Sequence, residues 1–425
     1  YPIDLIDVLR LAGANNLTIA YFTERIREAK AKEGEAAIWY LPDLSAGPSY
    51  TRHNGRIQST EGNILDVSKA SQFSGATIEL SLDPLAGIYE KLVAHQMRIA
   101  SEAAYHRSVI ETLNHAAAGY YDLVRALKMT VIAKDAVTRS EELLRLSERL
   151  AEGGAGLEAD VARSKAQLAQ DRQELLRSQQ DAAVAGSQLA LTLHLDPAVT
   201  LHVKDEVIRA IQLADESQSL ETLYDDALAN RPEIMEAKAR KQAAESSEKA
   251  ARWGPLTPEL VAAADFGAFG GGTGGRLRSY SDRTDLAILL RWRLEGMGLA
   301  DRKQYLAARS KRRQAGIRVS QVEDQIRAEL VETKRTLQTL SRQIDTSDQQ
   351  IKAATESLRL TEARFKGGAG LQLEVLQAQQ AFTQAQGNRL TAIVEYNKAQ
   401  HSLIRLLGRT PLPKSPPRPA GGTNP

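Results

Sequence analysis

The stretch Leu358-Arg-Leu-Thr-Glu-Ala-Arg-Phe-Lys-Gly-Gly-Ala-Gly-Leu-Gln-Leu-Glu-Val375 decides the fold of this chain. An upstream segment repeats it in the same register as Leu144-Arg-Leu-Ser-Glu-Arg-Leu-Ala-Glu-Gly-Gly-Ala-Gly-Leu-Glu-Ala-Asp-Val161. In both segments a long helical pattern ends at the glycines and then restarts. Glycine has no β-carbon to resist a tight reversal between two helices. We therefore interpret the chain as an internal duplication built on two helical hairpins.

The composition argues against some classes of function. The formal net charge is +2, and no basic block points to nucleic acid. The absence of cysteine weakly supports export into an oxidising compartment, where stray thiols would pair. No apolar run approaches the roughly 20 residues of a membrane helix. Because the chain starts at Tyr1 without methionine, we interpret it as a processed product, and lipidation of the mature N-terminus is left open.

Helical periodicity predicts two very long helices, at about residues 85–151 and 298–366, each about 100 Å long. Within them, apolar residues recur at alternating steps of three and four, a repeat typical of coiled-coil packing. After each glycine turn we expect a returning helix, at residues 157–193 and 371–407. Shorter helices are predicted at 5–11, 16–39 and 219–229 and from Pro232 onwards.

Period-two alternation predicts one β-hairpin in each half of the chain. In the first half, apolar side chains at 76, 78, 80 and 82 alternate with polar ones, and residues 43–51 also look extended. A polar stretch, residues 52–74, lies between these strands. In the second half, strands are expected at 260–268 and 286–294, joined by a glycine-rich loop at 270–275. That loop lacks the Gly-Lys-Ser/Thr of a phosphate-binding loop, so we interpret it as a hairpin connection.

Four strands cannot pair all their own edges in a lipid bilayer, and a closed membrane barrel needs at least about eight strands. The simplest closure takes four strands from each of several identical chains. Three chains would give a barrel of about 12 strands with a water-filled interior.

These ordered features resemble the TolC-like outer-membrane efflux protein family. The features are the two glycine reversals, Arg231-Pro-Glu233 at the start of the second half, and Leu290-Arg-Trp-Arg-Leu-Glu-Gly-Met-Gly298 before the second long helix. The resemblance covers residues 5–408. It implies a mainly α fold with a membrane β-barrel portion: a homotrimer with a barrel of about 12 strands in the outer membrane of a Gram-negative bacterium, continued by a long periplasmic α-helical barrel.

The resemblance also implies function and partners. The protein would be the passive export channel of a tripartite efflux or type I secretion system, gated at its periplasmic helical tips. It would dock onto a periplasmic adaptor protein and an inner-membrane pump of the RND or ABC type. No enzymatic activity, cofactor or metal is implied, and the histidines do not have metal-binding spacing. The alternative is a soluble structural coiled-coil protein without a membrane part.

The expected division of the chain follows the same plan. Its parts are periplasmic equatorial helical segments (1–40 and 195–252), the first β-hairpin (41–84), the first long helical hairpin (85–194), the second β-hairpin (253–297), the second long helical hairpin (298–408) and a Pro-rich tail without its own order (409–425).

Candidate functional residues lie at the two glycine turns. By resemblance, Glu374 matches an acidic residue that lines the closed periplasmic aperture of the family, with Asp160 as its counterpart in the first hairpin. Three copies would form a carboxylate ring that favours cations, although acids in a first helical turn also simply complement the helix dipole. Gln377 stands where some members carry a second acid. Arg364 is a candidate for the closed-state latch at a shifted position, and the neighbouring Phe365 lacks a hydroxyl group.

The turn glycines have a structural and a functional interpretation. They permit the reversal, and by resemblance they meet the adaptor. These glycines are Gly153, Gly154, Gly156, Gly367, Gly368 and Gly370.

Overall fold

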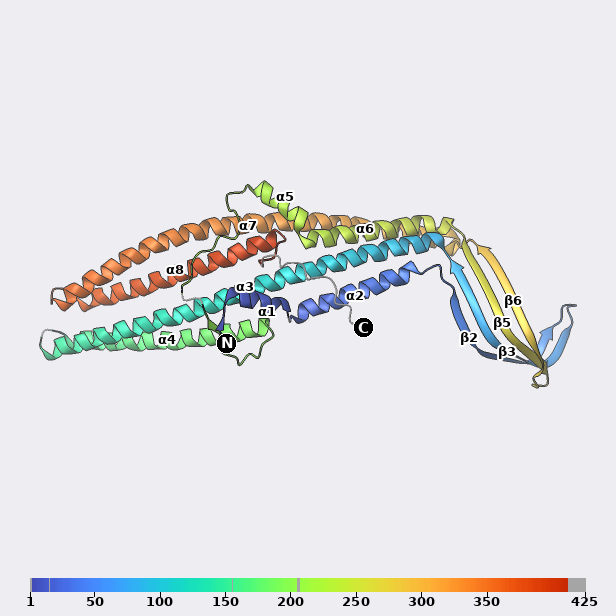
Figure 1. The fold of residues 1–425 in the computed structure, drawn as a ribbon, viewed down its shortest axis with the longest axis horizontal. Coiled ribbons are helices and arrows are strands. Elements are labelled where there is room, and N and C mark those ends of the chain that lie inside the picture. The colour runs from blue at the N-terminus through green and yellow to red at the C-terminus, as the bar shows by residue number, and fades with distance from the viewer. Residues whose placement is uncertain (1, 15, 155, 205–206, 412–425) are drawn as a thin grey trace, which may run out of the picture. The chain divides into compact units, whose positions relative to one another are not determined.

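A computed structural model describes residues 2–14, 16–154, 156–204 and 207–411 of the chain (Figure 1). The helices are α1 (Leu5–Ala14), α2 (Leu17–Ala37), α3 (Pro84–Glu152), α4 (Glu158–Thr192), α5 (Leu220–Asn230), α6 (Pro232–Trp253), α7 (Leu299–Lys366) and α8 (Gln372–Leu406). The strands are β1 (Pro2–Ile3), β2 (Asp43–Gln58), β3 (Ile64–Leu82), β4 (His202–Val203), β5 (Glu259–Thr273) and β6 (Arg278–Arg291). Short turns of 3₁₀ type occupy Gly254–Leu256 and Glu295–Gly298.

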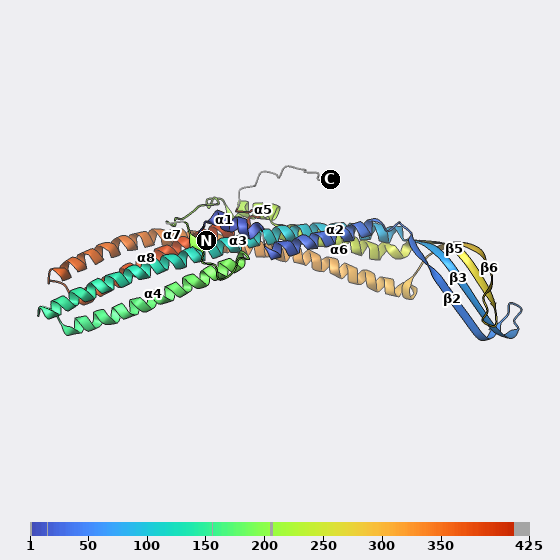
Figure 2. The same cartoon turned by 60° about the horizontal axis from the view of Figure 1, so that its bottom comes forward.

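The predicted long helices are confirmed. α3 and α7 begin and end within one residue of the expected bounds, and so do the returning helices α4 and α8. Figures 1 and 2 show α4 beside α3 and α8 beside α7. The expected Pro-rich tail lies, from residue 412 onwards, outside the described residues. Within the described part of the chain, no helix combines the length and the apolar character that crossing a membrane requires.

The strands differ in length from those predicted from the sequence. β2 and β3 continue through most of the polar stretch 52–74, where only a tight turn at about residues 59–63 interrupts them. This stretch was hidden because Ser, Gly, Asn and Gln alternate without a contrast between apolar and polar positions. At the other end, β6 ends at Arg291, so Trp292 and Leu294 lie beyond the strand. The two-residue strands β1 and β4, which pair in parallel, carry too short a pattern to be recognised.

The four long strands form one antiparallel sheet in the order β2-β3-β5-β6. The central pair, β3 and β5, joins the hairpins of the two halves, with Ile78 opposite Ala264. Because partners in register share a face, the predicted apolar positions of β3 lie on the same face as Leu260, Ala262 and Ala264. β2 and β6 each have one neighbouring strand within the described residues.

The opposite face of the sheet is polar and internally hydrogen-bonded. Thr77 donates to the Asp265 carboxylate (2.5 Å), and Ser81 donates to Glu259 (2.7 Å). Glu259 also pairs with Arg291, Nη2 to Oε2 at 2.7 Å. The sheet therefore separates an apolar face from a polar one, as the alternation predicted.

One close approach explains two strand glycines. Gly75 and Gly267 lie opposite each other on β3 and β5. A β-carbon on Gly75 would lie 2.2 Å from the carbonyl oxygen of Phe266 and 2.7 Å from the ring of Phe73. The Phe73 ring therefore covers this glycine pair, and no larger residue fits there.

The chain divides into two compact units. One unit comprises Tyr1–Glu24, Ala103–Ile234 and Gln321–Pro425, and the other comprises Arg25–Glu102 and Met235–Ser320. The first unit holds the two hairpin tips, and the second holds the four-stranded sheet. The long helices α3 and α7 contribute residues to both.

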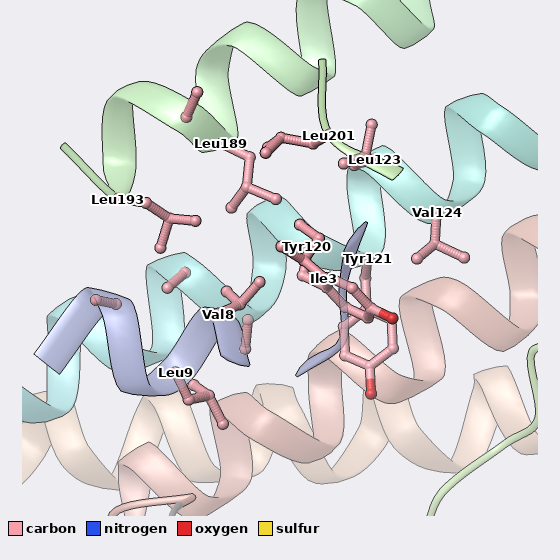
Figure 3. Packing of buried hydrophobic residues seen from close by; sticks show 14 of the residues in the cluster. Ile3, Val8, Leu9, Tyr120, Tyr121, Leu123, Val124, Leu189, Leu193 and Leu201 are labelled. Atoms are coloured by element: carbon pink, nitrogen blue, oxygen red, sulfur yellow. The ribbon is translucent and has the colours of Figure 1, made fainter. Parts of the chain in front are cut away.

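The core of the first unit gathers around Tyr120 and Tyr121 of α3 (Figure 3). Side chains from β1, α1 and the end of α4 pack against them, and Ile3, Val8 and Leu193 are almost completely buried. The short β1–β4 pair thus anchors the start of the chain to the segment that follows α4.

Candidate functional site at the hairpin tips

The two glycine turns have the same backbone. At the first, the amides of Gly153, Gly154 and Gly156 donate to carbonyls of the last turn of α3 at 3.1, 3.0 and 2.9 Å. At the second, Gly367 and Gly368 make equivalent bonds, each of 3.1 Å, to the end of α7. These bonds satisfy the helix carbonyls that would otherwise lack partners.

Two of the three glycines in each turn are required by geometry. Gly154 and Gly368 both have φ +73°, the left-handed region that favours glycine. Gly156 and Gly370 come too close to the preceding helix, since a β-carbon on either would lie 2.9 Å from a backbone nitrogen. The structural interpretation of these turns is therefore sufficient to explain the sequence, and adaptor contact remains a prediction.

The second turn brings Glu374 and Arg364 together. Glu374 lies in the first turn of α8, and its Oε2 is 3.5 Å from Nη1 of Arg364 at the end of α7. Arg364 also donates to the carbonyl of Ala369 at 3.4 Å. The Glu374 side chain is partly exposed, but its Oε2 is buried and makes no hydrogen bond of good geometry.

The first turn holds Asp160 differently. Its carboxylate pairs with Arg163 on the same helix at 2.9 Å. Among the described ion pairs, none joins Asp160 to the end of α3, as Arg364 at the end of α7 is joined to Glu374. Gln377 is exposed on α8. Thus the structure joins Glu374 with Arg364, whereas Gln377 is an exposed residue three positions further along α8.

Phe365 has a packing role that the sequence interpretation missed. It is buried in a cluster with Leu143 of α3 and Val375 and Leu376 of α8. The aromatic residue before the second turn therefore ties the end of α7 to both neighbouring helices. In the sequence, its place in the apolar stripe of an amphipathic helix was the feature that could have predicted this burial.

The buried amides near the tips were also missed. Gln372, at the start of α8, is 2% exposed and donates from Nε2 to the backbone carbonyl of Asp160 (2.9 Å) and to the hydroxyl of Ser164 (2.7 Å). Gln379, about two turns further along α8, is also buried. A glutamine side chain near the start of a helix is usually exposed to solvent, so no sequence pattern pointed to this buried contact.

A polar cavity of about 570 Å³ lies between α3, α4 and α8 further from the tips. Arg139 reaches it from α3 and donates to the Thr383 hydroxyl at 3.0 Å, with its guanidinium 5.1 Å from the centre of the Phe382 ring. Burial lowers the pKa of Arg139. Across the described ranges, no three His, Asp or Glu side chains gather closely enough to hold a metal ion.

Comparison with known proteins identifies the family. A family model described as outer membrane efflux protein matches residues 223–409. Over 420 residues the chain is 24% identical to OpmQ, the pyoverdine export outer membrane protein of Pseudomonas aeruginosa, covering 95% of this chain and 85% of the relative. The second half of the chain thus matches the outer membrane efflux protein family, and almost the whole chain resembles an outer-membrane export protein.

Solved structures agree in fold with this efflux protein. A membrane protein from Pseudomonas aeruginosa superposes with a TM-score of 0.84 at 20% identity, covering 96% of this chain and 90% of the other. The outer membrane protein VceC from Vibrio cholerae gives a TM-score of 0.79 at 18% identity, with 96% of each chain covered. These likenesses confirm the expected mainly helical fold with a β portion.

The resemblance to this family bears on three expectations. The protein is an export channel of the outer membrane and is not an enzyme, because the family consists of such channels. The soluble coiled-coil alternative does not fit a family of outer-membrane proteins.

Proposed function

We propose that this efflux protein is the channel-tunnel of a tripartite efflux or type I secretion system, which exports solutes passively from the periplasm or the pump to the exterior. The observation that carries the proposal is the four-stranded sheet, with one apolar face, one polar face and an edge strand on each side. Unpaired strand edges are not tolerated in lipid. The edges β2 and β6 therefore pair with copies of the same chain.

A homotrimer is the assembly that this sheet favours. Three chains with four strands each close a barrel of about 12 strands, which is wide enough for a water-filled lumen. The apolar face, which includes Leu286 (73% exposed) and Ile288 (69% exposed), then contacts lipid. The helical hairpins 85–194 and 298–408 line a periplasmic tunnel, with the segments 1–40 and 195–252 around its middle.

The hairpin tips are the proposed gate and the proposed docking surface. Gly153, Gly154, Gly156, Gly367, Gly368 and Gly370 form compact tips for contact with a periplasmic adaptor, which connects the channel to an inner-membrane RND or ABC pump. Because the relative OpmQ is a pyoverdine export protein, small organic molecules are the proposed cargo.

Glu374 is the proposed aperture residue, with Asp160 beside it, Arg364 as its counter-ion and Gln377 as an uncharged neighbour one turn away. Threefold symmetry converts Glu374 into a ring of carboxylates, and such a ring attracts cations. The ion pair of Glu374 with Arg364 at 3.5 Å supports a role for Arg364 in holding the closed state.

The test is single-channel recording of the purified trimer in lipid bilayers. Glu374→Gln should weaken block by Mg²⁺ about tenfold or more, since a ring of charge is lost, while the conductance without Mg²⁺ changes little. Glu158→Gln is the matched control, because Glu158 is an exposed acid in the first turn of the other hairpin. Unchanged block in Glu374→Gln would remove this residue from the aperture, and a monomeric protein without channels would overturn the whole proposal.

A further inference from the structure

A buried amide connects the two hairpins of one chain beside the candidate aperture residues. We call it the amide staple, which consists of the Gln372 side chain, the Ser164 hydroxyl and the backbone carbonyl of Asp160. Both N–H groups of Gln372 are used, at 2.9 Å to the carbonyl and 2.7 Å to the hydroxyl. The staple thus links the first turn of α8 to the first turns of α4.

The staple is buried: its Nε2 atom makes both hydrogen bonds, whereas Oε1 of Gln372 has no partner among the described residues. Ser164 is 1% exposed, and its hydroxyl lies 3.1 Å from that of Ser147 on α3. Ser147 in turn donates to the carbonyl of Leu143 at 2.9 Å. A buried amide needs hydrogen-bond partners, and a chain of such bonds fixes the geometry of the groups that it joins.

The staple is formed once per chain, although the sequence around it is duplicated. In the repeat register, Gln372 corresponds to Glu158, which is exposed, and Ser164 corresponds to Ala378, which has no hydroxyl. The duplication therefore does not supply a second staple. This asymmetry separates the staple from the glycine turns, which both hairpins need equally.

We propose that Gln372 is a positioning residue that sets the distance between the Asp160 and Glu374 carboxylates. Its amide binds the carbonyl of Asp160 itself, and its backbone lies two residues before Glu374 on the same helical turn. The two acids consequently act on a passing cation as one coupled pair. This inference rests on the proposed aperture and adds to it the residue that organises the two acids.

The basic residues nearby do not replace this link. Arg163 pairs with Asp160 along α4, and Arg364 pairs with Glu374 across the glycine turn. Each arginine therefore orients one carboxylate within its own hairpin, whereas the staple crosses between the hairpins.

The test is a double-mutant cycle on Mg²⁺ block of single channels, with Asp160→Asn and Glu374→Gln. With Gln372 present, the combined effect on the half-blocking concentration should depart from the product of the single effects by about fivefold or more. In Gln372→Met, which keeps the side-chain length but has no N–H donor, the two effects should multiply. Persisting non-additivity in Gln372→Met would overturn the proposal.

Gln380→Met is the matched control. Gln380 is also a glutamine of α8 that donates to a side chain of α4, at 2.9 Å to Gln167, but this contact is exposed. The cycle should stay non-additive in Gln380→Met, and a loss of coupling there would contradict a specific role for Gln372. If Gln372→Met does not assemble, Ser164→Ala removes one acceptor and should reduce the coupling partly, whereas full coupling would count against the staple.

A distance measurement separates this inference from the aperture assignment. The chain has no native cysteine, so spin labels at Asp160→Cys and Glu374→Cys report the separation of the two positions in the detergent-solubilised protein. The distribution of distances should broaden in Gln372→Met and stay narrow in Gln380→Met. An equally narrow distribution in Gln372→Met would overturn the positioning role, whatever the channel recordings say about the aperture.

Discussion

The returning helices α4 and α8 are equivalent in the duplication and yet differ sharply in burial. Both have 35 residues, both follow a glycine turn, and both end with a similar C-cap conformation. α4 buries six residues, whereas α8 buries 18. The copied backbone is therefore the same, but the neighbours of each helix decide which side chains are covered.

The difference follows from position within the first unit. α8 contacts α3 as well as α4, through pairs such as Arg125–Glu395 at 3.1 Å and Lys398–Asp122 at 3.1 Å. α4 leaves apolar side chains uncovered, among them Leu176 and Val184. One copy is thus an inner helix of the first unit, and the other leaves an apolar flank exposed.

The largest expected effect comes from Leu390 and Leu176, which occupy the same place in the two repeats. Leu390 is 7% exposed and Leu176 is 68% exposed. Leu390→Ala should lower the free energy of unfolding by about 2–5 kcal/mol, since it leaves a cavity in the core. Leu176→Ala should leave chain folding unchanged and instead lower the temperature at which the oligomer dissociates in detergent. Equal losses of folding stability in both variants would contradict the comparison.

His401 offers the next largest effect, through pH. It is buried on α8 beside Tyr121, and its repeat counterpart is the exposed Ser187. Burial lowers the pKa of His401 to about 4, below the value of about 6.5 in an unfolded chain. Between these values the unfolded state binds the proton more strongly, so stability is full above pH 6.5 and falls as the pH drops toward 4.

The His401 contribution should reach about 3 kcal/mol at the acid end of this window. Denaturant midpoints measured from pH 7 to pH 4 should therefore fall less steeply in His401→Phe than in the native protein. Ser187→Ala serves as the control and should follow the native profile. Parallel profiles for His401→Phe and the native chain would exclude this histidine as a source of the pH dependence.

Equivalent substitutions in the two glycine turns should lower the stability of the protein by similar amounts, because the two turns have similar backbones. Gly156→Ala and Gly370→Ala should each destabilise the protein by about 1–3 kcal/mol, since the new β-carbon collides with the preceding helix. Gly153→Ala and Gly367→Ala are the controls, with nearest contacts of 3.3 and 3.4 Å and no left-handed backbone. Thermal unfolding of the four variants measures the difference, and a large effect at one turn only would show that the turns are not equivalent.

The smallest expected effect concerns the ion pairs of the two tips. Arg163→Ala and Arg364→Ala should each change stability by no more than about 1 kcal/mol, because both arginines are largely exposed. Arg364→Ala should nevertheless raise the spontaneous opening of single channels, whereas Arg163→Ala should not. Identical gating in the two variants would remove Arg364 from the proposed latch.

Most of the helical architecture could be predicted from the sequence, for a physical reason. The apolar stripes of α3 and α7 are so long that single residues that do not fit the helical period do not obscure it. The glycine turns then mark where each of these helices ends. The strands were predicted only where apolar and polar residues contrast, as at Ile78 and Leu80. Through residues 52–74, both faces of β2 and β3 carry small or polar side chains, so periodicity is silent there.

The arrangement of side chains at the candidate site could be inferred from the sequence only in part. The acids and glycines of the tips could be found because their types have a meaning at a helix start or a tight turn. Gln372 and Phe365 could not, since their importance depends on which helix lies opposite. Burial of Gln372 against Ser164 is set by tertiary packing, and no local pattern distinguishes it from the exposed Gln377.

The long helices α3 and α7 contain 69 and 68 residues. At the tips, the Gln372 side chain of the second hairpin binds the first hairpin at Asp160 and Ser164, so a deletion in one long helix alone shifts its turn out of this register. An insertion or deletion in one long helix should therefore be tolerated only together with a matching change in the other. Length variation in such proteins should accordingly come in pairs of equal size, one in each half of the chain.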